Sequence, residues 1–265
     1  MSRSIHLLVV CASALSLAAL SGCRTVPISG RQQFIMKPMQ EETALGLQAF
    51  QEECKKEVVS NNPLYTAALR SCASSLVQVA EGGESYDWQF VVFASEEQNA
   101  YCLPGGKIAV YSGIMDLMNN EAELAFVVAH EISHAIARHY GESSAWGSVT
   151  DLGGQVLKSI NPDSAASTLY DPLVKYTVNL PFSRKDEYEA DLIGMILMAR
   201  AGYNPSAAIE FWSRFTEGKE QSALNGLMST HPRSVDRINA MRANLPRAMA
   251  EYNAAPQKKN YGMQL

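Results

Sequence analysis

Hydrophobic and polar positions are most clearly ordered between residues 120 and 140. Asn120, followed three residues later by Glu123, has the pattern of a helix N-cap with a carboxylate in the first turn. The run that follows, Leu-Ala-Phe-Val-Val-Ala at residues 124–129, is too apolar for a helix that faces solvent. Polar residues then interrupt the apolar pattern up to residue 140. The pattern predicts a buried helix whose polar side chains need partners inside the protein.

The remaining elements are predicted from shorter patterns. Aromatic and β-branched residues indicate strands, and Gly, Pro and capping residues mark the ends of helices. In chain order, the predicted elements are helices at residues 41–59 and 64–80, strands at 88–94 and 107–111 with the turn Pro104-Gly105-Gly106 before the second strand, and helices at 183–202 and 205–216.

The polar residues inside the buried helix form the run His130-Glu131-Ile132-Ser133-His134. Two histidines four residues apart lie on one face of a helix, with about 5–6 Å between their Cβ atoms, so both rings can reach one ion. Neutral imidazole nitrogen is a good ligand for zinc. Glu131 lies beside the first histidine, where it can take a proton from a water at the metal and pass it to a leaving amine. A polar turn that arose by chance is the alternative, and the cost of burying these groups without an ion argues against it.

A zinc ion that two histidines hold needs a third protein ligand and one open position for catalysis. Glu187 and Asp191 lie four residues apart near the start of the helix at 183–202, so they share a face of that helix. One carboxylate can bind the metal while the other orients a ligand histidine. Taken alone, acidic residues in a first helical turn merely complement the helix dipole. Beside an H-E-x-x-H run, the metal interpretation is favoured.

Four pieces of the chain together resemble metallopeptidase family 48, the gluzincin group that includes HtpX and the CaaX prenyl proteases. The resemblance implies an α+β, mainly α-helical fold with a small edge β-sheet against the active-site helix. It also implies one Zn²⁺ ion per chain, with Glu187 rather than Glu189 as the third ligand and Asp191 behind a ligand histidine. The matching pieces are Asn99-Ala100 with Pro104-Gly105-Gly106, His130-Glu131-Ile132-Ser133-His134, Ser183-Arg184 with Glu187-Tyr188-Glu189-Ala190-Asp191, and Ser229-Thr230-His231-Pro232.

His231 precedes a proline in a loop, where a histidine often only caps the following helix. The resemblance implies that His231 approaches the ion and either stabilises the tetrahedral oxyanion or occupies the open metal position at rest. Arg237 follows on the same segment and can pair with an active-site carboxylate.

An exposed edge of the predicted sheet can bind an extended peptide through main-chain hydrogen bonds. Asn99, Ala100, Gly105 and Gly106 match family positions that are expected to line the substrate cleft. A role in a turn is the alternative for Asn99 and Ala100.

Two other zinc-peptidase patterns do not match. A metzincin requires a glycine and a histidine three and six residues after the second ligand, where this chain has Ala137 and Tyr140. The inverted H-x-x-E-H order is absent as well. His139 lies about 140° round the helix from His134. It is therefore predicted to lie on the surface or behind the ligands rather than to bind the ion.

Residues 1–22 have the pattern of a secretion signal, because the apolar run at 7–20 is too short and too often interrupted by serine for a good membrane span. The run leads into Leu-Ser-Gly-Cys, which resembles the bacterial lipobox and predicts a lipid on Cys23, with residues 23–33 as a linker. An ordinary signal peptide with an incidental cysteine is the alternative. Arg24, after this cysteine, resembles lipoproteins of the outer membrane.

The rest of the chain is predicted to be a protease domain at residues 34–245 and a disordered tail at residues 246–265. Cys54 and Cys72 lie on the two helices predicted at the start of the domain. An antiparallel helix pair can bring them together as a disulfide in the oxidising periplasm, and free buried thiols are the alternative. Residues 141–180 are expected to fold over the cleft as a lid.

By resemblance, the protein is expected to be a zinc endopeptidase on the periplasmic side of the outer membrane. Its substrates would be misfolded, unfolded or stalled envelope proteins, with the outer-membrane assembly machinery as a partner. The net charge of −5 implies no basic surface for nucleic acid. Two other functions stay open, a metal-bound chaperone or assembly factor whose cleft rarely cuts, and an amidase of cell-wall peptides.

Overall fold

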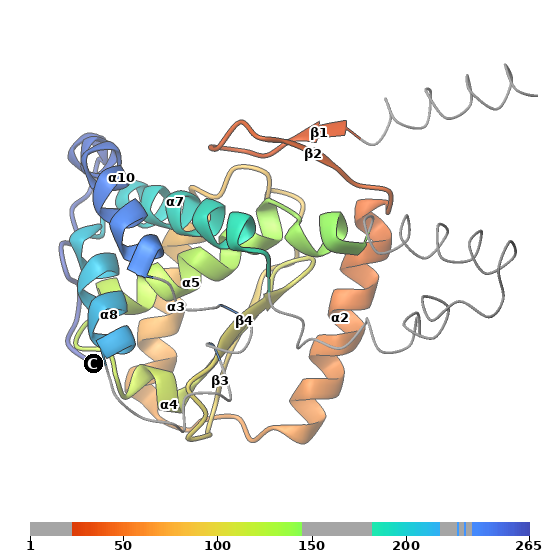
Figure 1. Cartoon of the computed structure of the whole chain (residues 1–265). Helices are drawn as coiled ribbons and strands as arrows, with labels where there is room; N and C mark the ends of the chain where they lie inside the picture. Colours follow the sequence, from red (N-terminus) through yellow and green to blue (C-terminus); the bar gives the residue numbers. More distant parts are fainter. Residues whose placement is uncertain (1–22, 145–181, 218–226, 228–230, 232–234) are drawn as a thin grey trace, which may run out of the picture.

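Helices form most of the structure, and a small sheet lies among them (Figure 1). The computed structural model describes residues 23–144, 182–217, 227, 231 and 235–265. The expected α+β, mainly α-helical class is confirmed. In chain order, the main elements are β1 (Cys23–Thr25), β2 (Gln32–Phe34), α2 (Met39–Lys56), α3 (Pro63–Val77), β3 (Gln89–Phe93), β4 (Ala100–Leu103), β5 (Lys107–Tyr111), α4 (Ser112–Met115), α5 (Glu121–Ile136), α7 (Arg184–Arg200), α8 (Ser206–Glu217) and α10 (Val235–Ala254).

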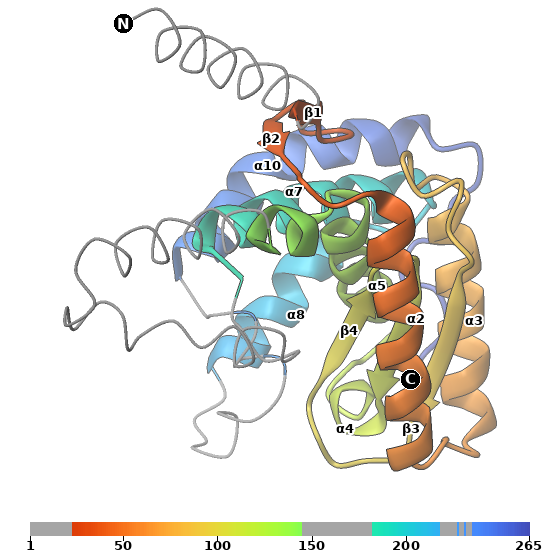
Figure 2. The same cartoon turned by 90° about the vertical axis from the view of Figure 1, so that its right-hand side faces the viewer.

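Three strands form the sheet in the order β3-β5-β4, with β3 parallel and β4 antiparallel to the central β5. Alternate side chains of each strand point to opposite faces. Ile108 and Val110 of β5 pack into the main core with residues of α5, whereas Ala109 and Tyr111 pack with Phe50 of α2. Figure 2 shows α2 running along this second side. The sheet therefore has helices on both faces and β4 at one edge.

The edge strand β4 has no clear signal in the sequence. All four of its residues are buried, so they lack the alternation that marks a half-exposed strand. The turn that follows was predicted and is confirmed, since Gly105 and Gly106 adopt φ values of 82° and 83°. A Cβ atom on Gly106 would lie 2.6 Å from the ring of Trp88. This turn therefore needs glycine for both its conformation and its packing.

Helix α5 lies at the centre of the fold, and all of its residues are buried. The side chain of Asn120 accepts a hydrogen bond from the backbone N–H of Glu123 at 3.2 Å, so the predicted N-cap is confirmed. α5 packs against α3, α7, α8 and β4. A Cβ atom on Gly194 of α7 would lie 3.0 Å from the backbone nitrogen of His130. The close approach of α5 and α7 therefore depends on a residue without a side chain.

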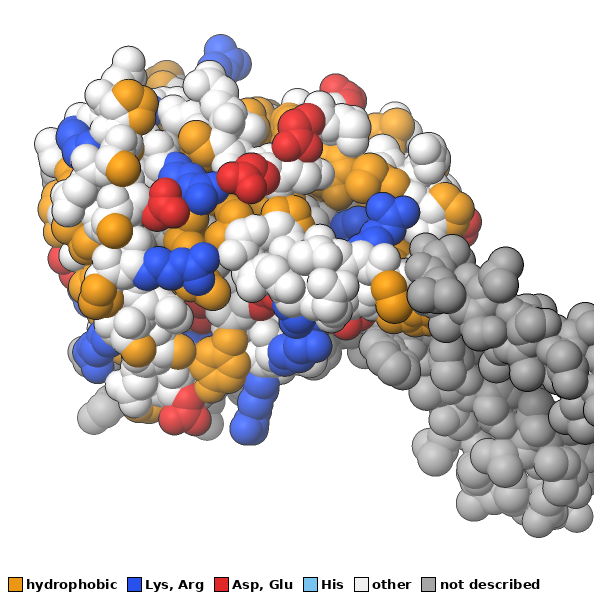
Figure 3. Space-filling view, turned by 90° about the horizontal axis from the view of Figure 1, so that it is seen from above, with side chains coloured by type: hydrophobic (Ala, Val, Ile, Leu, Met, Phe, Trp, Pro, Cys, Tyr) orange, Lys and Arg blue, Asp and Glu red, His pale blue; other side chains and the backbone are white. Residues whose placement is uncertain are grey.

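Residues 23–34 form a hairpin, so the expectation of a linker at 23–33 is wrong. β1 pairs with β2 in antiparallel register, and Val26 in the connecting loop is buried. Arg247 of α10 donates a hydrogen bond to the backbone oxygen of Ile28 at 3.2 Å. Figures 1 and 2 both place the hairpin above α7, and Figure 3 looks onto this side. Acidic and basic side chains are interspersed with apolar ones there.

The prediction of a disordered tail at residues 246–265 is also wrong. α10 extends well into this segment, and the residues after it cover the N-terminus of α5. The backbone N–H groups of Glu121 and Ala122 donate to the backbone oxygens of Met263 and Tyr261 at 2.8 and 3.0 Å. Because the first N–H groups of a helix have no partner within it, the tail is ordered by satisfying them.

The predicted disulfide between Cys54 and Cys72 is wrong, because both are free cysteines. Cys54 is exposed on α2, whereas Cys72 is buried where α3 packs into the main core. Phe50 of α2 packs on one face of the sheet and Cys72 of α3 packs in the main core on the other face, so the two cysteines do not meet.

Two sequence predictions lie outside the described residues. They are the signal segment at 1–22 and, apart from its first residues, the lid at 141–180. Within the described ranges, no helix combines the length and the apolar character that crossing a membrane requires.

Candidate metal centre

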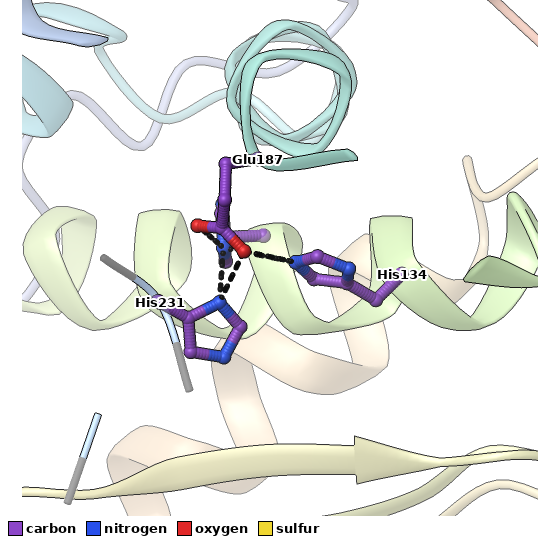
Figure 4. A group of neighbouring side chains, drawn as sticks. His134, Glu187 and His231 are labelled. Carbon is purple, nitrogen blue, oxygen red and sulfur yellow. Dashed lines mark hydrogen bonds and ion pairs between the residues drawn. The ribbon is translucent and has the colours of Figure 1, made fainter. Parts of the chain in front are cut away.

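Four side chains from three separate segments converge in the interior. His130 and His134 come from α5, Glu187 from the first turn of α7, and His231 from the segment before α10. One ligand atom from each residue lies within 4.8 Å of the others. Figure 4 shows the Glu187 carboxylate reaching from α7 toward the rings of His134 and His231. The two helices that carry the sequence motifs therefore meet at one point.

The chemistry of this group fits a metal ion. Nε2 of His130 lies 3.2 Å from both Nε2 of His134 and Nδ1 of His231. All three rings are buried, and a neutral imidazole has only one nitrogen that can donate. Imidazole nitrogens that converge with a carboxylate form the ligand set of zinc and similar divalent ions. The residues present can therefore hold such an ion.

The Glu187 carboxylate lies between the three rings and a buried arginine. Its Oε1 atom is 2.9 Å from Nδ1 of His231 and 3.5 Å from Nε2 of His134. Its Oε2 atom is 2.6 Å from Nη1 of Arg237. Burial raises the pKa of Glu187, but the charges of His231 and Arg237 outweigh burial and lower it. Glu187 is therefore ionised at neutral pH, in the state that binds a cation.

Asp191 lies one turn further along α7, behind His130. Its Oδ1 atom is 3.1 Å from Nδ1 of His130. The Nε and Nη2 groups of Arg237 donate to its two oxygens at 2.8 and 2.7 Å. Burial raises the pKa of Asp191, but Arg237 and His130 outweigh burial and bring the pKa to about 2. The predicted pairing of Arg237 with a carboxylate of the site is confirmed.

Glu131 lies between the ligand group and the edge strand. Its Oε1 atom is 3.3 Å from Nε2 of His231. Burial raises the pKa of Glu131, although His231, His130 and a hydrogen bond from the backbone of Cys102 oppose the rise. A raised pKa brings proton exchange closer to neutral pH, which suits a general base. Because Cys102 is in β4, the edge strand passes beside this carboxylate.

His231 contacts two acidic side chains at once. Its Nδ1 atom faces Glu187 and its Nε2 atom faces Glu131. Burial lowers the pKa of His231, but these two carboxylates outweigh burial and raise it. The ring is buried among the site residues, so the alternative of a histidine that only caps α10 does not account for its position.

Sequence reasoning missed the support behind His134. Nδ1 of His139 lies 2.8 Å from Nδ1 of His134, and Nε2 of His139 lies 3.0 Å from Oε2 of Glu189. His139 is fully buried, so of its two predicted positions the one behind the ligands is correct. Phe182 also stacks on His134, with 3.9 Å between ring centroids. The position of His139 just after the H-E-x-x-H run was the one sign of this support.

The four residues predicted to bind substrate lie outside the ligand group. Gly105 and Gly106 form the turn between β4 and β5 and pack against neighbouring side chains. Asn99 bonds its own neighbour, since its side-chain oxygen accepts from the backbone N–H of Ala100 at 2.9 Å, and Ala100 is buried at the start of β4. Contact of these residues with a substrate stays a prediction.

Buried imidazole and carboxylate groups on two crossing helices, with a glutamate between them and an edge strand, define a metallopeptidase of the gluzincin class. Residues 63–245 match the model of peptidase family M48. The chain belongs to this family and is a metalloendopeptidase.

Curated relatives include mitochondrial metalloendopeptidases and a bacterial protease. The mitochondrial metalloendopeptidase OMA1 of Schizosaccharomyces pombe is 33% identical over 230 residues, which cover 85% of this chain and 67% of that protein. The human OMA1 metalloendopeptidase is 27% identical over 240 residues, covering 84% of this chain and 46% of that protein. The β-barrel assembly-enhancing protease of Escherichia coli is 29% identical over 189 residues, covering 67% of this chain and 38% of that protein.

Proposed function

We propose that this metalloendopeptidase uses one zinc ion per chain and works at the periplasmic face of the outer membrane. Its substrates are misfolded or stalled envelope proteins, and a lipid on Cys23 anchors it. The observation that carries the zinc assignment is the convergence of His130, His134 and Glu187 with one ligand atom each, next to the carboxylate of Glu131.

Each of these side chains has a defined part in peptide hydrolysis. His130, His134 and Glu187 would hold the ion, which supplies Lewis acidity when it is bound. Glu131 takes a proton from the attacking water and then passes it to the leaving amine, and its raised pKa favours this transfer. Asp191 keeps the ring of His130 in place from behind.

The edge strand β4 accounts for how a peptide would be held. An extended substrate that pairs with this edge would pass next to Glu131, because the backbone of Cys102 in β4 already bonds that carboxylate. Main-chain pairing makes few demands on sequence, which suits an enzyme for unfolded segments. Asn99 and Ala100 at the start of β4 belong to this surface in our proposal.

The membrane location rests on the N-terminal sequence and on one relative. Cys23 follows the lipobox-like sequence and is exposed at the start of β1. The E. coli relative is named for enhancing β-barrel assembly, which supports a link to outer-membrane assembly machinery. The OMA1 relatives are mitochondrial, so similarity alone does not choose the compartment.

The enzymatic part is tested with Glu131→Gln. The variant is expected to bind one zinc ion per chain, as the parent does, and to digest unfolded casein about 10²–10⁴-fold more slowly. A chelator should abolish digestion by the parent, and added Zn²⁺ should restore it. Glu84→Gln, at an exposed position, is the matched control. Casein digestion by Glu131→Gln at the parent's rate would refute the assigned base.

The anchor is tested with Cys23→Ser in a Gram-negative host supplied with labelled palmitate. The parent should take up label and sediment with outer membranes, whereas Cys23→Ser should do neither. Cys54→Ser changes a second cysteine that is exposed in the described part of the chain and should behave as the parent. Label that persists in Cys23→Ser would overturn the anchor and leave the peptidase assignment untouched.

The position of His231 favours a second function, a metal-bound chaperone or assembly factor whose cleft is latched. The ring lies between Glu131 and Glu187, where it competes with water for the reacting position. A latch predicts that His231→Ala digests casein faster, whereas an oxyanion-stabilising role predicts slower digestion, with unchanged zinc content in both cases. Rescue of envelope defects by Glu131→Gln in a deletion strain would favour the chaperone.

A further inference from the structure

We propose that the N-terminal hairpin is part of the support of the metal centre. In this proposal Arg31 and Ser29 of the hairpin fix Glu189, and Glu189 fixes His139, which orients His134 toward the ion. The proposal rests on His134 as a metal ligand, which belongs to the proposed function. It adds positioning residues from a segment outside the part of the chain that the family model matches.

The contacts form an unbroken path from the hairpin to the ligand. Nε and Nη2 of Arg31 lie 2.8 and 2.7 Å from Oε2 of Glu189, and the hydroxyl of Ser29 donates to Oε1 of Glu189 at 2.5 Å. Oε2 of Glu189 lies 3.0 Å from Nε2 of His139. Nδ1 of His139 then lies 2.8 Å from Nδ1 of His134. Each of these distances is within hydrogen-bonding range, and each pair of atoms can supply one donor and one acceptor.

The path lies inside the protein. The side chains of His134 and His139 have no exposed area, Glu189 retains 6% and Arg31 retains 16%. Burial without partners would be costly for each of these polar groups. Their mutual bonds are therefore a built network rather than a chance surface contact.

Metal binding would determine which atom donates and which accepts at each hydrogen bond of the path. Nε2 of His134 faces the ligand group, so this nitrogen must lose its proton to bind an ion and Nδ1 must carry the proton. The Nδ1–H group then donates to Nδ1 of His139. His139 in turn carries its proton on Nε2 and donates to Glu189, whose charge is balanced by Arg31. With an ion on Nε2 of His134, this arrangement of neutral rings satisfies every link.

The other histidine of α5 shows the same logic. Nδ1 of His130 faces Asp191, and Asp191 is held by two nitrogens of Arg237. Both ligands therefore end, through a carboxylate, at an arginine on another segment. Arg31 holds the carboxylate that supports His134 through His139, and Arg237 holds the carboxylate that supports His130. A carboxylate behind a ligand histidine is a common device that fixes ring orientation.

The test measures Zn²⁺ affinity of the purified full-length protein by competition with a chromophoric chelator. Arg31→Gln is expected to weaken affinity about tenfold, within the range for partners behind metal ligands. Ser29→Ala removes one bond to Glu189 and should weaken affinity less. Arg24→Gln, exposed on the same hairpin, is the matched control and should match the parent.

A second control separates the path from general support of the hairpin. Glu142 also binds Arg31, at 2.7 Å, but is not one of the links between Arg31 and His134. Glu142→Gln removes the charge of this second partner but leaves the bonds from Arg31 and Ser29 to Glu189, so Zn²⁺ affinity should stay within about twofold of the parent. Thermal unfolding of the metal-free variants measures how much each change disturbs the fold itself.

His139 provides the sharpest comparison. His139→Asn keeps an acceptor near the position of Nδ1, whereas His139→Phe removes it. Affinity should fall in the order parent, His139→Asn, His139→Phe. The visible spectrum of the Co²⁺-loaded protein should shift most in the Phe variant, because that spectrum reports ligand geometry.

Two outcomes are distinguishable. If the parent itself binds no Zn²⁺, the proposed function fails. If the parent binds Zn²⁺ and Arg31→Gln, Ser29→Ala and His139→Phe bind it as tightly as Arg24→Gln, the hairpin has no part in the metal centre.

Discussion

The two histidines of α5 are supported by different parts of the molecule. His130 is held through Asp191 on α7 and Arg237 on α10, both inside the segment that the family model matches. His134 is held through a second imidazole, a carboxylate and Arg31, which belongs to the N-terminal hairpin. One support is short and made by the core helices, whereas the other is longer and reaches the periphery. The difference suggests that the two ligands respond unequally to changes outside the core.

The largest effect is expected when the short support is broken. Asp191→Asn keeps the size of the side chain but removes the charge that Arg237 faces, and the pKa of Asp191 near 2 shows how strongly that charge is stabilised. Zn²⁺ affinity should fall about 10–100-fold. The free energy of unfolding should fall by less than the roughly 3–5 kcal/mol that an uncompensated buried charge costs, because Arg237 keeps its contact with Glu187 at 2.6 Å.

Chelator competition and denaturant unfolding measure these two quantities. Asp116→Asn is the control, because Asp116 follows α4 and bonds the exposed Tyr65 hydroxyl instead. A variant with parent-like affinity would show that the short support does not orient His130.

A middle-sized effect is expected from the tail, which bonds the start of the helix that carries both histidines. Deletion of residues 257–265 removes the acceptors for the N–H groups of Glu121 and Ala122 at the start of α5. Each unsatisfied group costs about 1–3 kcal/mol if water does not replace the partner. Stability should therefore fall by about 2–4 kcal/mol, with a smaller loss of affinity than Asp191→Asn causes. A truncated protein with unchanged thermal unfolding would contradict this account of the tail.

The smallest effect is expected from Gly194→Ala, which changes the distance between the two helices. Its Cβ atom would lie 3.0 Å from the backbone nitrogen of His130, so α7 must move by a few tenths of an ångström. Alanine favours a helix over glycine by about 1 kcal/mol, which offsets the strain. Stability should change by less than about 1 kcal/mol while Zn²⁺ affinity falls a few-fold. If the free energy of unfolding and the Zn²⁺ affinity changed to the same extent, the distance between α5 and α7 would have no specific effect on the metal ligands.

The sequence predicted the features that depend on helical geometry. The spacing of His130 and His134, and of Glu187 and Asp191, is a property of a single helix, so it can be read without knowing the fold. The caps at Asn120 and Ser183 are equally local, and both helices begin where the caps predict.

Features that depend on contacts between distant segments could not be predicted in this way. Glu189 and Arg31 are 158 residues apart in the chain, and no periodic pattern connects them. The tail looked disordered because its partner, the start of α5, lies far away in the sequence. The disulfide prediction was wrong for a related reason, because the periodicity of a helix does not show which face of the sheet that helix covers.

The hairpin has one more consequence. If Cys23 carries the proposed lipid, no flexible linker separates that lipid from the folded protein, because strand pairing begins at Cys23 itself. The distance between the active site and the membrane would then be limited by the size of the folded protein. If the proposed anchor is present, substrate chains near the lipid surface would lie within reach of the active site, whereas chains farther away would have to diffuse to it.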